Sequence, residues 1–240
     1  MLLFLCKVDK KALLSVPKQG PAILIGNHVN FLDAPIAYSY LFPRDIISLV
    51  KEETFNNPLL KFLFKTWGSI PIKRATADFE AINNAIDVLN EGKFLAIAPE
   101  GTRTKDGRLI QAHTGIVIIA LKSKVPIIPI VQYGGEKFLD NIKKLQRTKI
   151  TMQVGKPFIV YTSTNHPGKE ERQQITNEIM YQLALLMPEE YRGHYSDLNK
   201  MTTDFLNFDV NIEKSTHISL REKVSNAIRK YFSTAKNPAA

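Results

Sequence analysis

Short apolar runs alternate along the chain with longer segments in which apolar residues recur every three or four positions. A run of about four to eight apolar residues bounded by turn residues is typical of a buried strand. Such runs predict strands at residues 23–26, 46–50, 69–72, 94–98, 127–131 and 150–154. Pro126 and Pro129 remove backbone donors from the fifth run, so we expect an edge, an end or a bulge there.

The three-to-four spacing predicts helices with one face in a hydrophobic core. The clearest stripes are Phe79, Ile82, Ile86 and Leu89, which end near Gly92, and Ile175, Ile179, Leu183 and Leu186. Strands interleaved with helices indicate a mostly parallel sheet, because a helix carries the chain back between parallel neighbours. We therefore expect a single α/β domain with a mostly parallel central sheet flanked by helices.

The composition fits one sizeable domain of this class, since 44% of the 240 residues are hydrophobic. A single cysteine, Cys6, excludes an internal disulfide and fits a reducing compartment. The formal net charge of +9 favours an anionic partner, such as a phospholipid surface, nucleic acid or an acidic carrier protein. The sequence has no zinc-ligand spacing, Walker loop, dinucleotide-binding glycine pattern or helix-turn-helix signature, so nucleic acid is not expected as a partner.

Membrane spanning is not expected from the hydropathy pattern. The longest uncharged stretches, residues 19–32 and 109–121, have 14 and 13 residues, short of the roughly 18 to 20 that cross a bilayer. The apolar start at residues 1–6 is too short for a signal peptide and has no basic residue before it. We expect a cytoplasmic protein that is peripherally associated with the membrane, is not secreted and has no transmembrane helix.

His28 follows the predicted strand at 23–26, and Asp33 lies five positions later. In an extended chain the two side chains point to opposite faces, so they meet only in a tight turn, which Asn30 and Pro35 allow. A neutral imidazole is a suitable base for a hydroxyl proton, and a carboxylate on its other nitrogen fixes the tautomer. The pair fits acyl transfer to an alcohol; the plainer interpretation is two separate caps of a loop-to-helix junction.

Glu100, Gly101, Thr102 and Arg103 come directly after the predicted strand at 94–98. Gly101 permits close backbone approach, Thr102 offers a hydroxyl, and Arg103 offers a planar guanidinium suited to a phosphate. This combination predicts an anion-binding loop. The alternative is an ordinary strand-to-helix turn with a surface arginine.

These two motifs, with residues 68–74 between them and residues 125–130 after them, resemble the glycerolipid acyltransferases in order and spacing, in particular the 1-acyl-sn-glycerol-3-phosphate acyltransferases. The resemblance implies a glycerol-3-phosphate acyltransferase-like fold. The reaction that it implies requires no metal or other cofactor. It makes His28 the base and Asp33 the residue that orients the base. It assigns the substrate phosphate to Glu100, Gly101, Thr102, Arg103, Arg74 and, more loosely, Lys51. It assigns the wall of the acyl site to Val125, Pro126, Ile127 and Pro129.

The chain departs from the family pattern at two positions. Asn30 stands where the family usually has serine, a change between two small polar residues. His113 stands where the family commonly has a lysine, two positions before Gly115. His113 is either a weaker cation or a loop histidine whose hydrogen bonds are satisfied, and the second interpretation is preferred.

The resemblance covers residues 12–195, preceded by a short apolar stub at 1–11 and followed by an extension at 196–240. In the extension, Leu220, Val224, Ile228 and Tyr231 share one helical face beside basic residues. Such a helix either lies on anionic lipid or packs back on the domain. Membrane contact through the basic segment 136–149 is an equal alternative.

The activity implied by the resemblance is transfer of a fatty acyl chain from a thioester to the sn-2 hydroxyl of 1-acyl-sn-glycerol 3-phosphate, also called lysophosphatidic acid. The product is phosphatidic acid, and the donor is acyl-CoA or acyl-carrier protein. The implied partners are therefore the thioester donor, lysophosphatidic acid and an anionic membrane surface. The alternatives are an acyltransferase with another acceptor, such as glycerol 3-phosphate or another lysophospholipid, and a non-catalytic lipid-binding protein of the same fold.

Overall fold

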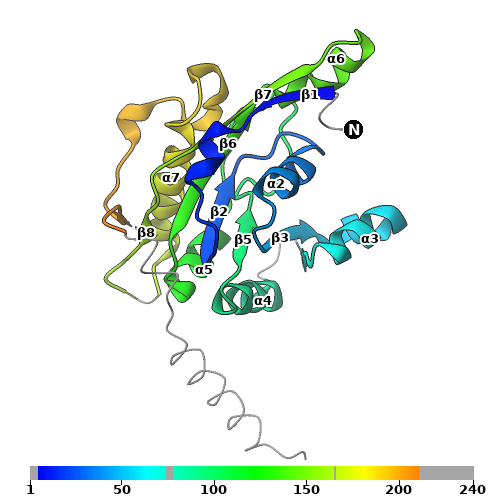
Figure 1. Ribbon diagram of the computed structural model, residues 1–240. Helices are drawn as coiled ribbons and strands as arrows, with labels where there is room; N and C mark the ends of the chain where they lie inside the picture. Colours follow the sequence, from blue (N-terminus) through cyan, green and yellow to red (C-terminus); the bar gives the residue numbers. More distant parts are fainter. Residues whose placement is uncertain (1–4, 74–77, 165, 211–240) are drawn as a thin grey trace, which may run out of the picture.

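The computed structural model describes residues 5–73, 78–164 and 166–210, and a seven-stranded sheet forms its centre (Figure 1). From one edge to the other the strands follow the order β1, β7, β6, β2, β5, β3, β4. Their bounds are Cys6–Asp9 (β1), Ala22–Gly26 (β2), Ile46–Lys51 (β3), Ile70–Ile72 (β4), Phe94–Ile97 (β5), Ile127–Tyr133 (β6) and Thr148–Val154 (β7). A separate antiparallel pair joins β8 (Ile159–Val160) to β9 (Leu206–Asn207).

Neighbouring strands of the sheet run in parallel except for β6 and β7, which pair antiparallel. Helix α2 (Asp33–Leu41) lies between β2 and β3 in the chain, α4 (Phe79–Asn90) between β4 and β5, and α5 (Gly115–Ser123) between β5 and β6. The chain therefore leaves β2 toward one edge of the sheet and later returns to its other side. In open α/β sheets, ligands bind beyond the carboxyl ends of the strands at such a reversal.

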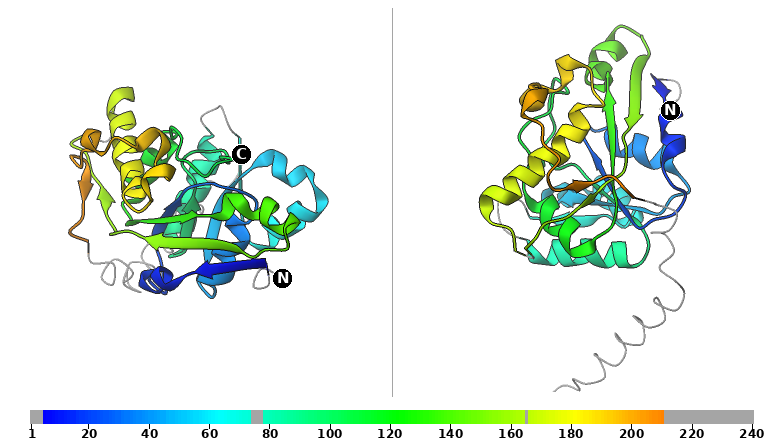
Figure 2. Two further views of the ribbon diagram at one scale, coloured as in Figure 1. Left: turned by 90° about the horizontal axis from the view of Figure 1, so that it is seen from above. Right: turned by 90° about the vertical axis from the view of Figure 1, so that its left-hand side faces the viewer.

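Helices cover both faces of the sheet (Figures 1 and 2), so the prediction of a mostly parallel sheet flanked by helices is confirmed. Strand β2 shows the two layers directly. Ala22 and Leu24 belong to a core that includes residues of α2, whereas Ile23 and Ile25 belong to a second core with α4, α5 and α7 (Lys169–Ala184). A strand buried on both faces is continuously apolar rather than alternating, as this run is.

The six predicted strands and the two predicted helices are present, and one detail differs from the expectations. Residues 6–9, placed in the amino-terminal stub, form β1 at the edge of the main sheet, parallel to β7. Strand β6 is not an edge, but the predicted alternatives of an end and a bulge are both met: Pro126 directly precedes its start, and at Pro129 residues 128–129 of β6 face the longer segment 155–157. Its partner strand is interrupted there, between the pairing of Ile130 with Val154 and an isolated bridge from Ile127 to Phe158. No ladder hydrogen bond is therefore lost at the proline nitrogen.

Helices α3 (Pro58–Thr66) and α6 (Phe138–Lys143) project from the same side of the molecule, on the right in Figure 1 and in the left panel of Figure 2. Neither is a membrane span, because no helix in the described ranges is long and apolar enough to cross a bilayer. The amphipathic helix predicted within residues 196–240 lies outside the described residues, as does everything after residue 210.

Candidate active site

A cavity of about 1130 Å³ lies at the carboxyl ends of β2, β3, β5 and β6, where the reversal of strand order predicts a ligand site. Polar residues that follow these strands line one part of it. Apolar side chains from α2, α4 and α5 line the rest, among them Leu41, Ile82 and Ile119. The cavity can therefore receive a molecule with a charged end and a long apolar end.

His28 and Asp33 meet at the wall of this cavity. The distance between His28 Nδ1 and Asp33 Oδ2 is 2.6 Å, which is short and typical of a charge-assisted hydrogen bond. With the carboxylate accepting from Nδ1, the other ring nitrogen, Nε2, is left as the basic atom. Both residues line the cavity, so that nitrogen is available to a bound hydroxyl group.

A tight turn between β2 and α2 brings the pair together, as the sequence predicts. The Asp33 carboxylate accepts hydrogen bonds from the backbone amides of Val29, at 2.8 Å, and Asn30, at 3.1 Å. The Asn30 side chain accepts from the Leu32 amide at 2.9 Å and donates to the Gly135 carbonyl at 2.7 Å. A shorter serine side chain could make the first contact. The second contact requires the side-chain nitrogen of Asn30, Nδ2, which serine lacks, and it connects the turn to the loop after β6.

The backbone of His28 is clamped by the loop that follows β5. Its amide donates to Glu100 Oε1 at 2.9 Å, and its carbonyl accepts from the Thr104 amide at 2.9 Å. Glu100 Oε2 accepts from the Ile110 amide at 3.0 Å. Glu100 is 1% exposed and does not line the cavity. It therefore holds the base in place, and it does not reach a ligand phosphate as a direct contact.

Burial gives the Glu100 carboxyl an unusual titration. Loss of solvent raises its pKa to about 7, against the opposing effect of the two amide hydrogen bonds from His28 and Ile110. The neighbouring Asp33 carboxylate raises the pKa further. The ionised carboxylate accepts one hydrogen bond at each oxygen, from the His28 amide and from the Ile110 amide. When one oxygen carries a proton, that oxygen is a poorer acceptor for its amide.

A second clamp, which the sequence does not reveal, fixes the end of β2. Asn27 Nδ2 donates to the Gln132 carbonyl at 2.8 Å, and Asn27 Oδ1 accepts from the Gln132 amide at 2.9 Å. Both residues are buried. Because these bonds join residues 105 positions apart, no local spacing signals them.

Gly101, Thr102 and Arg103 line the cavity beside His28. Gly101 has a φ of +66°, a left-handed conformation that favours glycine, and an added Cβ would lie 2.7 Å from His113 Cδ2. Thr102 and Arg103 are exposed to the cavity. Within the described part of the chain the Arg103 guanidinium has no hydrogen-bond or ion-pair partner, so it can bind an anion.

His113 also lines the cavity, and its ring lies against Gly101. The ring is exposed and has no hydrogen bond to the described residues, so the preferred interpretation of a satisfied loop histidine does not fit this position. Its backbone amide donates to the Pro99 carbonyl at 2.9 Å, which holds His113 beside the loop that follows β5. The position suits a ligand contact.

Lys51 lines the cavity at the end of β3, where its Nζ lies 3.2 Å from Glu53 Oε1. Lys73, at the end of β4, lines it as well and was not singled out from the sequence. Arg74 lies outside the described residues.

The structure does not bring the fourth sequence block to the cavity. Val125, Pro126, Ile127 and Pro129 occupy the amino-terminal part of β6 and the residues before it, away from the strand ends. The residues of β6 that line the cavity are Ile130, Val131 and Gln132. The apolar wall is built mainly by helices, whose contribution is not visible as one motif.

A sequence model of the family described as Acyltransferase matches residues 7–133, just over half of the chain. This stretch contains β1 to β6, and therefore the His28 turn, the loop at 100–103 and the strand ends that surround the cavity.

Three relatives are named 1-acyl-sn-glycerol-3-phosphate acyltransferase. A 1-acyl-sn-glycerol-3-phosphate acyltransferase of Borreliella burgdorferi is 29% identical over 126 residues, which cover 52% of this chain and 50% of that protein. One from Limnanthes douglasii is 35% identical over 116 residues, 47% of this chain and 41% of the relative. One from Bacillus subtilis is 24% identical over 69% of this chain and 80% of the relative. The chain thus spans about half the length of the first two relatives.

A solved structure supports the fold. The crystal structure of the 1-acyl-sn-glycerophosphate acyltransferase PlsC from Thermotoga maritima superposes with a TM-score of 0.53 and 24% sequence identity. The match covers 74% of this chain and 70% of that one. At this identity the similarity concerns the arrangement of the sheet and helices.

Proposed function

This chain belongs to the acyltransferase family, and from that premise we propose that it transfers a fatty acyl chain from a thioester to the sn-2 hydroxyl of 1-acyl-sn-glycerol 3-phosphate. The observation that carries the proposal is the hydrogen-bonded pair of His28 and Asp33 at the wall of a cavity with a cationic and an apolar part. The donor is acyl-CoA or acyl-carrier protein, and the product is phosphatidic acid.

In the proposed reaction, His28 Nε2 takes the proton of the acceptor hydroxyl as its oxygen attacks the thioester carbonyl. A carbon–oxygen bond forms, the carbon–sulfur bond breaks, and the leaving thiolate takes the proton from the imidazolium. Asp33 holds the imidazole in the required tautomer and stabilises its charged form. No protein nucleophile is needed, because the acceptor supplies its own oxygen.

The acceptor phosphate is proposed to bind at Gly101, Thr102 and Arg103. A guanidinium without a protein partner can donate two parallel hydrogen bonds to a phosphate. Lys51 and Lys73 add positive charge to the same cavity. Arg74 remains a proposal from the resemblance alone. Glu100 is assigned the different task of holding the His28 backbone.

The test is turnover of acyl-CoA and lysophosphatidic acid by the purified protein, followed as free thiol and as phosphatidic acid. His28→Ala is expected to lower kcat by about 10²- to 10⁴-fold, the usual contribution of a general base. Asp33→Asn is expected to lower kcat with little change in KM, because the amide favours the wrong tautomer. His166→Ala is the matched control, since His166 is exposed and does not line the cavity.

Phosphatidic acid formed by His28→Ala at the wild-type rate would refute the assigned base. A donor comparison between acyl-CoA and acyl-carrier protein identifies the thioester. Competition by glycerol 3-phosphate and lysophosphatidylcholine identifies the acceptor, since a headgroup larger than phosphate is expected to clash with Arg103.

A further inference from the structure

Helix α3 exposes apolar side chains although it is part of a well-packed domain. None of its residues is buried, and Leu59 and Phe62 are 74% and 71% exposed. Its other exposed positions include Lys61 and Lys65. A helix with large apolar side chains and lysines together is typical of a surface that meets lipid headgroups and acyl chains.

Helix α6 and the turn after it have the same character. Leu139 and Leu145 are exposed, Leu145 at 97%. Three lysines surround them, Lys137, Lys143 and Lys144, with Asp140 as the acidic residue on the helix. Larger exposed apolar patches on soluble domains usually mark interaction sites.

The backbone at Leu145 strengthens this observation. Leu145 has a φ of +54°, in the left-handed region that favours glycine. It follows α6 where the Gln146 amide donates to the Asn141 carbonyl at 2.8 Å, a helix ending in which glycine is usual. A leucine at this position has an unfavourable backbone conformation, and its side chain is exposed to solvent. It therefore does not stabilise the folded domain by packing.

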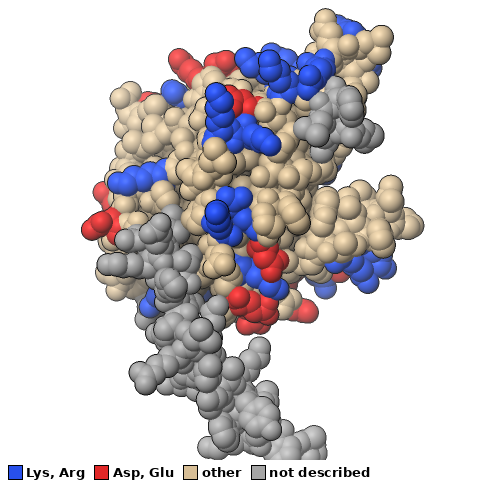
Figure 3. All heavy atoms as spheres, viewed as in Figure 1, with Lys and Arg blue, Asp and Glu red and all other residues tan. Residues whose placement is uncertain are grey.

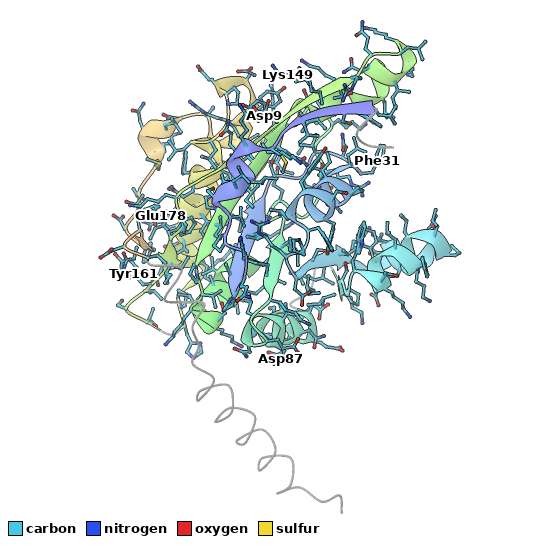
Figure 4. All side chains as sticks on the ribbon, viewed as in Figure 1. Asp9, Phe31, Asp87, Lys149, Tyr161 and Glu178 are labelled. Carbon is cyan, nitrogen blue, oxygen red and sulfur yellow. The ribbon has the colours of Figure 1, made fainter. Side chains whose placement is uncertain are left out.

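Helix α3 borders the cavity, and α6 packs on a residue that lines it. Phe64 of α3 lines it directly, and Phe31, which also lines it, packs edge-to-face on Phe138 at the start of α6, with ring centroids 5.7 Å apart. Figure 4 shows Phe31 on the side from which α3 and α6 project, between them. In Figure 3 the α3 lobe is mostly uncharged, with basic side chains at its lower edge.

We propose that the exposed apolar side chains of α3 and α6 insert into an anionic phospholipid bilayer and so place the mouth of the cavity on its surface. This inference rests on the proposed function, because lysophosphatidic acid and phosphatidic acid are lipids that must enter and leave the cavity. The lysines favour a bilayer over a second copy of the chain, since two copies of this face would oppose like charges.

The test measures sedimentation of the full chain with vesicles of phosphatidylcholine alone and of phosphatidylcholine with phosphatidylglycerol. The α3 variant is Leu59→Ser with Phe62→Ser, and the α6 variant is Leu139→Ser with Leu145→Gly. Leu145→Gly suits the backbone at this turn, so loss of binding cannot be attributed to strain. The matched control is Leu14→Ser with Leu185→Ser, because both leucines are exposed but lie on neither helix.

Wild type and control are expected to bind the anionic vesicles more tightly than the neutral ones. Each helix variant is expected to bind anionic vesicles at least about tenfold more weakly, in line with the loss of two buried apolar side chains. Unchanged binding by both helix variants would overturn the proposal. A wild-type dimer in light scattering that the same variants make monomeric would overturn it in favour of self-association.

Vesicle binding requires no turnover, so its outcome is independent of the proposed reaction. A short-chain lysophosphatidic acid below its critical micelle concentration separates the two further. Both helix variants are expected to retain wild-type kcat/KM with this monomeric acceptor and to lose rate only with acceptor in vesicles. Equal loss with both acceptors would assign the helices to the cavity instead of the membrane.

Discussion

At the scale of single residues, Glu100 links the position of the base to pH. Its pKa is about 7 in the folded chain, against an ordinary value of 4.5. Between these values the folded protein holds a proton that the unfolded chain has released. The free energy of unfolding is therefore expected to fall by about 3 kcal/mol as the pH rises from 4.5 to 7, and this contribution is constant above 7.

The measurement is urea unfolding at several pH values for wild type and Glu100→Gln, whose amide does not titrate. The difference between the two proteins isolates the contribution of Glu100, because all other groups are common to both. Parallel stability curves for wild type and variant would contradict the assignment. The stability of wild type relative to Glu100→Gln is expected to fall by about 3 kcal/mol between pH 4.5 and 7, because the uncharged amide of the variant has no ionisation to disfavour.

Gly101 and His113 are expected to be energetically coupled. Gly101→Ala places a side chain at a φ of +66°, which costs about 1 kcal/mol, and presses its Cβ against His113 Cδ2 at 2.7 Å. His113→Ala removes only the second effect. In a double-mutant cycle measured by urea unfolding, Gly101→Ala should cost about 1 kcal/mol less in the His113→Ala background. Strictly additive effects would mean that the His113 ring moves aside freely.

The sequence could predict some of the residues that line the candidate site, but not all of them and not all of their contacts. His28, Asp33, Gly101, Thr102 and Arg103 were predictable because each follows a recognisable strand in a motif with chemical meaning. The task of Glu100 was not, since only the folded chain shows its carboxylate turned away from the cavity onto two amides. The Asn27–Gln132 clamp was invisible for a related reason, because Asn27 follows β2 whereas Gln132 lies in β6, 105 positions later.

At the scale of elements, Asp78 joins the start of α4 to the end of β4. Its carboxylate accepts from the Ala81 amide at 3.0 Å and from the Lys73 amide at 2.8 Å. These two hydrogen bonds lower its pKa, so the stabilisation is present above the ordinary pKa of an aspartate and is lost as the pH falls through the lowered value. Asp78→Ala is expected to reduce the free energy of unfolding by about 1 kcal/mol at pH 7.

Asp78→Asn is the matched variant, because asparagine is also a good helix cap and keeps an acceptor oxygen. It should recover most of the loss in thermal or urea unfolding. If both variants lost the same stability, the charge rather than the hydrogen bonds would be responsible.

Elements buried on both faces were the most predictable, and edge elements the least. The apolar runs of β2, β5 and β6 predict strands because parallel central strands have no solvent face. Strand β1 has the residues Cys6, Lys7, Val8 and Asp9, which form no apolar run, and only its pairing with β7 makes it a strand. The location of β6 inside the sheet depends on the interruption of its partner at Gly155, which a local pattern does not encode.

At the scale of the whole molecule, the net charge of +9 predicts how the proposed docking depends on salt. Exposed lysines attract an anionic bilayer over a Debye length, which shrinks from about 10 Å at 0.1 M salt to about 3 Å at 1 M. Binding of wild type to anionic vesicles is therefore expected to weaken steeply between these concentrations. Binding driven by apolar insertion alone should change little with salt.

Variants of the full chain separate these two contributions in the same sedimentation assay. Lys61→Gln with Lys65→Gln should reduce binding at low salt by about fivefold for each lysine and flatten the salt dependence. Leu59→Ser with Phe62→Ser should lower binding at every salt concentration while keeping the steep dependence, because the attractive charges remain. If the lysine variant kept the wild-type salt dependence, the attraction would come from other basic residues. The α3 surface would then contribute insertion but not charge.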